Sequence, residues 1–168
     1  MRKWIEQPLL DRAEIEARHE AVAELLQRPI QRGDLRDDLR LVADIERLVS
    51  RAATGTAGPR DLAALAASLR ALPRVVRPIL GMVAPRLVGL TKQIGEHREL
   101  AQLLTQALVE DPPHTIRDGG VFRPEYDAEL DKLRDLARNG RSYIAALESA
   151  ERQRTGIANL KVGYNSVF

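Results

Sequence analysis

The chain contains no cysteine, so disulfide bonds and thiolate metal sites are excluded. Aromatic residues make up only 4% of its 168 residues, whereas leucine, alanine and arginine are abundant, which is typical of helical proteins. No apolar run approaches the roughly 20 residues that a membrane-spanning helix needs, and no apolar stretch follows Arg2 and Lys3, as it would in a signal peptide. We therefore expect a cytoplasmic protein without a membrane partner, long enough to form one domain with a core.

Clusters of positive charge and catalytic motifs are also lacking. The 26 basic and 24 acidic residues give a net charge of +2, and no run of Lys or Arg exceeds two, so charge alone does not indicate a nucleic-acid binder. No phosphate-binding Gly-x-x-x-x-Gly-Lys-Ser/Thr loop occurs. His19, His97 and His114 lack metal-ligand spacing, and we expect His19 to be packed inside its helix seam. Acidic pairs such as Asp37-Asp38 are expected on solvated, arginine-rich helix faces, so the chain is predicted not to be an enzyme.

Helix signals cover most of the chain up to residue 110. Asp11 with Glu14 resembles a capping box and predicts a helix to about residue 27. Its predicted apolar seam consists of Ile15, His19, Val22 and Leu26. Further helices are predicted at 34–53, with Leu35, Leu39, Val42, Ile45 and Val49 as its stripe, at 59–73 and at 97–110. Three prolines between residues 73 and 95 predict short helices and turns.

The second half of the chain contains a longer helix signal. Residues 115–117 and 121–123 flank Asp118-Gly119-Gly120 and predict a small hairpin or loop near 115–123. A single helix of about 45 Å is predicted over 126–155, because apolar residues recur there at alternating spacings of four and three. This seam consists of Tyr126, Leu130, Leu133, Ala137, Gly140, Ile144 and Leu147. The seam is expected to be buried, and the charged helix end that follows it is expected to be bare.

A strand-like segment follows this helix. Gly156 is expected to be the C-cap, and aromatic and β-branched residues predict a terminal strand over 160–168. A strand without a following partner is half a hairpin, so we expect the chain to be part of a longer protein. Where the strand is ordered, we expect its edge to pair with a second copy.

Five short motifs occur in the order found in the bacterial MutS family of DNA mismatch-recognition ATPases, which this chain resembles. They are Trp4-Ile5-Glu6-Gln7-Pro8-Leu9, Asp44-Ile45-Glu46-Arg47-Leu48, Gly58-Pro59-Arg60-Asp61-Leu62, Arg117-Asp118-Gly119-Gly120-Val121 and Tyr126-Asp127-Ala128-Glu129-Leu130-Asp131. The sequences Glu151-Arg152-Gln153-Arg154-Thr155-Gly156 and Leu160-Lys161-Val162-Gly163-Tyr164-Asn165 close the series. The family often has glycine just before the Tyr126 position, where this chain has Glu125.

The resemblance implies an all-α, multi-helix bundle of the MutS core (lever) type over 1–155, followed over 156–168 by the first strand of the clamp domain. In this family an N-terminal domain reads the mismatch, a C-terminal ABC-type domain hydrolyses ATP with Mg²⁺, and the core helices link the clamp to the ATPase. This chain contains neither the mismatch-reading Phe-x-Glu motif nor a Walker motif, so we expect no ATPase activity and no cofactor. The family also implies double-stranded DNA, a homodimer and a MutL-type repair partner, at the bacterial nucleoid.

Candidate DNA contacts lie around the end of the last helix. The resemblance favours contacts with backbone phosphates by Arg152, Arg154, Lys161, Asn165 and Ser166. From the residues alone, the three cations equally fit a charged tip that keeps an exposed strand edge soluble. A helical scaffold or protein-interaction module with no nucleic-acid role also remains an alternative, since composition and periodicity fit it as well.

Overall fold

The computed structural model describes residues 5–162, except for the side chain of Arg141. The chain forms two compact units, Met1–Arg123 and Pro124–Phe168. The described residues are mainly helical and contain no extended strand, so the all-α prediction is confirmed for this part of the chain. No helix among the described residues is long and apolar enough to cross a membrane. The predicted start of a clamp domain at residue 156 stays a prediction.

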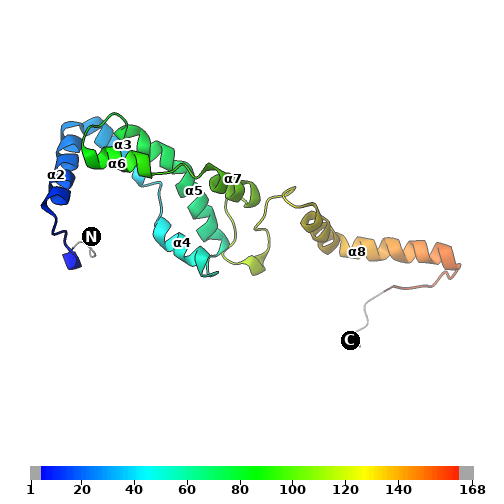
Figure 1. Cartoon of the computed structure of the whole chain (residues 1–168). Coiled ribbons are helices and arrows are strands. Elements are labelled where there is room, and N and C mark those ends of the chain that lie inside the picture. The colour runs from blue at the N-terminus through cyan, green and yellow to red at the C-terminus, as the bar shows by residue number, and fades with distance from the viewer. Residues whose placement is uncertain (1–4, 163–168) are drawn as a thin grey trace. The chain divides into compact units, whose positions relative to one another are not determined.

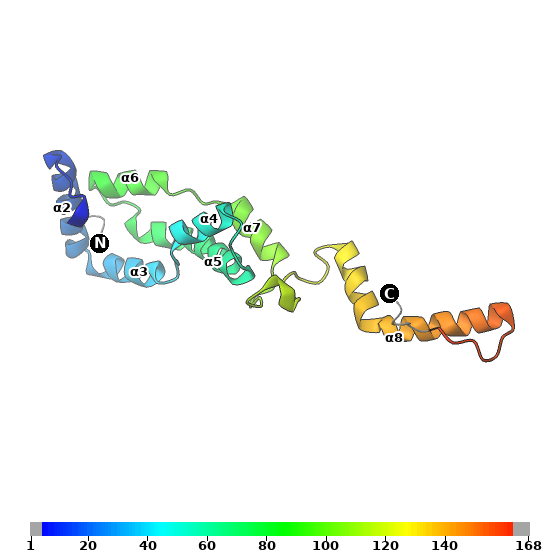
Figure 2. The ribbon, with the colours of Figure 1, turned by 90° about the horizontal axis from the view of Figure 1, so that it is seen from below.

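The first unit is built around one long helix (Figure 1). Its elements are α2 (Arg12–Gln27), α3 (Pro29–Leu39), α4 (Ile45–Ala53), α5 (Pro59–Val76), the 3₁₀ helix η1 (Arg77–Ile79), α6 (Pro85–Gln93) and α7 (Arg98–Ala107). Helix α5 packs against α3, α4, α7 and η1, while α2 packs against α3 and α6 (Figure 2). The core consists of three apolar clusters, one between α2, η1 and α6, one between α4, α5 and α7, and one between α5, α7 and Val121.

Helix α2 begins where its cap predicts, but its buried face differs from the predicted seam. Asp11 accepts hydrogen bonds from the N–H groups of Ala13 at 2.8 Å and Glu14 at 3.3 Å, which confirms the N-cap. His19 is exposed, as are the two apolar seam residues after it, so the prediction of a packed histidine is wrong. Ala21 and Leu25 instead pack into the cluster that contains residues of α6 and η1. The contact partner lies about 60 residues away, which local periodicity cannot reveal.

The predicted helix over 34–53 is two helices. Asp44 is the N-cap of α4, because its side chain accepts a hydrogen bond from Arg47 N at 3.0 Å, and a new helix therefore begins after it. The N–H of Ala43 donates to Ser68 Oγ of α5 at 3.0 Å instead of to a helical carbonyl. Leu48, only 1% exposed, is the main apolar anchor of α4, whereas Val49 of the predicted stripe is exposed. A capping aspartate and a long-range acceptor thus interrupt an otherwise helical sequence.

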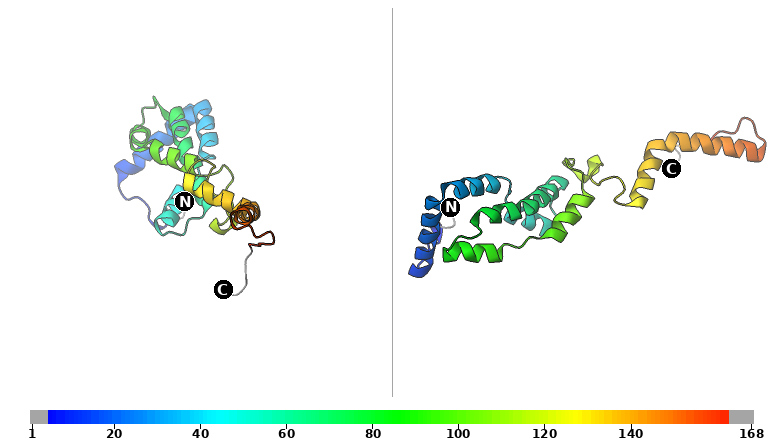
Figure 3. Two further views of the ribbon diagram at one scale, coloured as in Figure 1. Left: turned by 90° about the vertical axis from the view of Figure 1, so that its right-hand side faces the viewer. Right: turned by 90° about the horizontal axis from the view of Figure 1, so that it is seen from above.

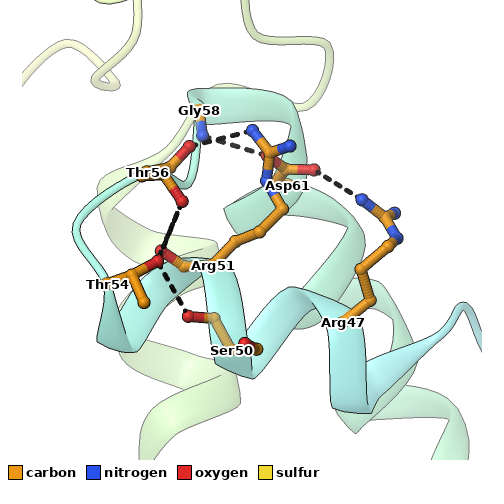
Figure 4. A network of polar contacts seen from close by, with 7 residues as sticks. All are labelled: Arg47, Ser50, Arg51, Thr54, Thr56, Gly58 and Asp61. Carbon is orange, nitrogen blue, oxygen red and sulfur yellow. Dashed lines mark hydrogen bonds and ion pairs between the residues drawn. The ribbon is translucent and has the colours of Figure 1, made fainter.

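The start of α5 is held by one carboxylate (Figure 4). Asp61 accepts from Gly58 N at 3.1 Å and forms ion pairs with Arg51 at 2.9 Å and Arg47 at 3.7 Å, both from α4. The Gly58 N–H lowers the pKa of Asp61 most, and the two guanidinium groups add to this, although burial opposes it. Asp61 therefore also joins α4 to α5. The helix runs past its predicted end at Pro73 to Val76. Proline costs one helical hydrogen bond there, but Ala71 and Val75 on either side of it are buried.

A second carboxylate joins α2 to the start of α6. Glu24 accepts from Ala84 N at 2.8 Å and from Val83 N at 3.0 Å, and forms an ion pair with Arg28 at 3.2 Å. The N–H of Ala84 is the largest cause of a lowered Glu24 pKa, with further lowering by Val83 N–H and Arg28 against the opposing effect of burial. Glu24 thus satisfies backbone donors at the N-terminus of a distant helix.

The loop after α7 contains the 3₁₀ helix η2 (Ile116–Asp118). Val121 O accepts from Val109 N at 3.0 Å, and Arg123 N donates to Ala107 O at 2.9 Å, so residues 121–123 pair with 107–109. The hairpin interpretation of 115–123 is therefore wrong, while the alternative interpretation as a loop describes the segment. Burial of Val121 beside Ala107 and Leu108 accounts for the different pairing.

The second unit contains helix α8 (Ala128–Thr155), which confirms the long C-terminal helix. Asp127 caps it by accepting from Leu130 N at 2.7 Å. Glu125 adopts a φ of 67°, in the left-handed region that glycine favours. The ribbon of α8 is sharply bent between its yellow first part and its orange second part (Figure 2). Ser142 Oγ donates to Asn139 O at 2.8 Å, a back-bond that often accompanies bent helices.

The apolar seam of α8 is not buried. Leu133 is 58% exposed and Leu147 is 40% exposed, while Leu130 and Ile144 are only partly buried. The prediction of a buried seam is therefore wrong for the described residues of this chain. Among the described residues of its own unit, 124–162, there is no second helix against which the seam of α8 can pack.

Candidate nucleic-acid interface

The candidate site begins where α8 ends. Gly156 is the C-cap, with a φ of 72° and a ψ of 7°, and its N–H donates to Arg152 O at 2.9 Å. Glycine suits this position because a Cβ in the left-handed region is strained. The chain then reverses and runs back beside the last turns of α8 (Figures 2 and 3). We call residues 157–162 the return segment.

Two glutamate–arginine pairs occupy the last two turns of α8. Glu151 and Arg154 pair through Nε at 2.9 Å and Nη2 at 2.7 Å, and the Arg154 side chain is 74% exposed. Glu148 and Arg152 form the other pair, in which the Arg152 side chain is 40% exposed. The prediction that both arginines would be exposed holds for Arg154 but is wrong for Arg152, which is partly buried.

Arg152 is held by the return segment. Its Nε donates to Leu160 O at 2.8 Å, and its Nη2 pairs with Glu148. The other oxygen of Glu148 accepts from Val162 N at 3.2 Å. Glu148 was absent from the predicted site: its spacing of four from Arg152 indicates a helix pair, but no local pattern reveals the bond to Val162.

Lys161 lies between these two anchored backbone groups. Its side chain is exposed, and it forms no ion pair with any residue in the range 5–162. Only part of the predicted strand, 160–162, is described, and it pairs with no other strand. The remainder, including Asn165 and Ser166, lies outside the described residues, so the predicted role of these two side chains remains a prediction.

The charge of the tip is close to balanced. Over residues 144–162, Arg152, Arg154 and Lys161 contribute three positive charges, and Glu148 and Glu151 contribute two negative ones, leaving +1. Three cations beside two carboxylates give a weak field, which suits contacts with a few phosphates better than autonomous tight binding. The geometry therefore leaves Lys161 and Arg154 as the most accessible cations of the predicted set.

Other polar clusters of the described chain serve packing. Asp38, expected on a solvated face, is buried and pairs with Arg74 of α5 at 2.9 Å, as a buried carboxylate requires. His114 Nε2 lies 2.8 Å from Arg60 Nη1, and His97 is the N-cap residue of α7. No group of three or more histidine or acidic residues within 5–162 has the arrangement of a metal site.

Comparison with known proteins gives a consistent result over the whole chain. The family described as MutS domain III matches residues 1–153. DNA mismatch repair protein MutS of Symbiobacterium thermophilum is 45% identical over 168 residues, which are 100% of this chain and 19% of that protein. The MutS proteins of Methanothrix thermoacetophila and Solibacter usitatus are 43% and 44% identical, over 99% and 100% of this chain and 20% and 19% of their own lengths. The chain thus spans about a fifth of the length of these curated relatives.

Proposed function

Because this chain belongs to the MutS family, as the segment of a DNA mismatch repair protein that corresponds to MutS domain III, we propose that it is a mechanical link. In this proposal its helices transmit movement between a DNA clamp and the ATPase of the full-length protein. The chain itself carries out no chemistry; ATP and Mg²⁺ are bound elsewhere in the protein. Homodimerisation and a MutL-type partner belong to the same proposal.

The observation that carries the proposal is the form of α8. It is a 28-residue helix, about 42 Å long if it were straight, and it ends in the charged tip. Its apolar seam is exposed over much of this length, including Leu133 and Leu147. An exposed apolar stripe on a long helix can pack against another element of the full-length protein, which would make α8 a rigid lever.

DNA contact is proposed at the backbone only. Lys161 and Arg154 are accessible cations, and Asn165 and Ser166 would add hydrogen-bond donors to phosphates. The described residues present a near-neutral tip, so binding should be weak, dependent on salt and indifferent to sequence. Titration with a matched and a mismatched duplex tests this. A preference above about tenfold for the mismatch, or 1.4 kcal/mol, would contradict the proposal.

The mechanical role is tested by softening α8 in the full-length protein. Ala145 and Ala146 are exposed, and replacing both with glycine costs about 1 kcal/mol each in helix stability without touching the tip. We expect DNA binding and ATP hydrolysis to persist separately, while ATP-dependent release from DNA is lost. The matched control places the same two substitutions at Ala13 and Ala23, exposed positions of α2. Unchanged release in the α8 variant would show that a stiff helix is not required.

A further inference from the structure

The two acid–base pairs at the end of α8 differ in what they hold. Glu151 and Arg154 bond to each other along the helix. Glu148 and Arg152 also bond to each other, but both reach off the helix to the return segment. Arg152 binds Leu160 O at 2.8 Å and Glu148 binds Val162 N at 3.2 Å, so the backbone is held on both sides of residue 161.

We propose that Glu148 and Arg152 are positioning residues that fix the path of the chain leaving α8, and thereby set where Lys161 meets DNA. The inference rests on the proposed DNA contact. Without these two side chains, the backbone of the return segment would lose the bonds on either side of Lys161. The entropic cost of ordering the return segment would then be offset mainly by one turn hydrogen bond, from Leu160 N to Ile157 O at 3.2 Å.

The chemistry of the pair suits this role. The guanidinium of Arg152 donates from Nε to a carbonyl and from Nη2 to a carboxylate at the same time, which the single ammonium of lysine cannot reproduce in the same geometry. Glu148 uses one oxygen for Arg152 and the other for Val162 N. The charge of Arg152 is therefore balanced by Glu148, and its Nε and Nη2 groups already have partners. In this proposal Arg152 is not itself a phosphate ligand.

The sign of the change in DNA affinity distinguishes a positioning role of Glu148 from a simple effect of its charge. A carboxylate near DNA repels phosphate, so simple electrostatics predicts that Glu148→Ala strengthens DNA binding. Loss of a positioning group predicts that the same substitution weakens binding. Glu151→Ala removes an equal charge one turn further on, from a pair that does not touch the return segment, and is the matched control.

The experiment compares Glu148→Ala with Glu151→Ala, and Arg152→Lys with Arg12→Lys, in the full chain. Arg12 forms an exposed pair with Glu16 in α2, outside the proposed DNA contact. Amide hydrogen exchange at Val162 is expected to accelerate about fivefold in Glu148→Ala, the equivalent of its one lost hydrogen bond. In Arg152→Lys, which loses the bond to Leu160 O instead, the acceleration should be smaller, and exchange should stay unchanged in the two controls. Affinity for a matched duplex at low salt is expected to fall about threefold in Glu148→Ala and Arg152→Lys. It should rise slightly or stay constant in the two controls.

A charge-swapped double variant, Glu148→Arg with Arg152→Glu, separates the ion pair from the backbone bonds. It restores opposite charges, but it places a donor against Val162 N–H and an acceptor against Leu160 O. We expect it to behave as Glu148→Ala does, and full recovery would overturn the proposal. Stronger DNA binding by Glu148→Ala, or unchanged Val162 exchange, would also overturn it. If the unmodified chain binds no DNA, the proposed function fails, and the exchange measurement alone decides whether the pair holds the segment.

Discussion

Ser68→Ala tests whether one buried hydroxyl maintains the break between α3 and α4. Ser68 lies in α5 and is fully buried, at 0% exposure. Its Oγ donates to Ala64 O at 2.7 Å and accepts from Ala43 N at 3.0 Å. The second bond joins α5 to the linker before α4, which is 25 residues earlier in the sequence. The substitution removes this acceptor and nothing larger than an oxygen atom.

Two effects of opposite sign decide the magnitude. Alanine has the higher helix propensity, which favours the variant by about 0.5 kcal/mol. Leaving the Ala43 N–H without its acceptor costs about 1–3 kcal/mol, depending on how well water replaces the hydroxyl. We therefore expect the first unit to lose about 0.5–2.5 kcal/mol of unfolding free energy. Ser50→Ala, at an exposed position of α4, carries the propensity gain alone and should be neutral or slightly stabilising.

Urea unfolding of the first unit gives the unfolding free energy of both variants. Amide exchange in α4 and α5 shows where the structure has loosened. The Ala43 amide reports the lost bond directly, and its exchange should accelerate in Ser68→Ala but not in Ser50→Ala. If Ser68→Ala were as stable as the unmodified chain and Ala43 exchanged at the same rate, the hydroxyl would not hold the linker. The explanation for the helix break would then reduce to the Asp44 cap.

Three further predictions concern the core, the turns and acid stability. Leu48→Ala should cost about 2–5 kcal/mol because the side chain is 1% exposed, whereas Leu133→Ala should cost less than about 1 kcal/mol in this chain; equal losses in urea unfolding would contradict the assigned burial. Gly156→Ala should loosen the last turn of α8 by about 1–2 kcal/mol, seen as faster amide exchange there, while Glu125→Gly should be neutral or stabilising, since both positions have positive φ. The lowered pKa of Glu24 means that its contribution to stability is present at neutral pH, above its ordinary value of about 4.5, and is lost as the pH falls through the folded value. Glu24→Gln should therefore be less stable at pH 7 and should lose less stability than the unmodified chain between about pH 5 and pH 3 in thermal melts; parallel pH profiles would refute the role of the carboxylate.

Signals that act within one helical turn were predictable from the sequence. The Asp11 cap, the start of α5 at Pro59 and the Gly156 C-cap all appear where predicted. Each depends on a side chain or backbone group no more than four residues away, so the local sequence contains all the partners. The ordered motifs likewise led to the MutS family, which the comparisons confirm.

Contacts between distant segments were decided only by the tertiary structure. Periodicity alone predicts an apolar stripe for α2 and for α8, but the side that is buried depends on which other element packs there. For α8, the described part of its own unit contains no second helix. Arg152 illustrates the same limit at the candidate site. The sequence predicts a cation at the helix end, but its bond to Leu160 O exists only because Gly156 turns the chain back beside α8. A side chain's charge is thus set by its own chemistry, whereas its partners are set by the path of the whole chain.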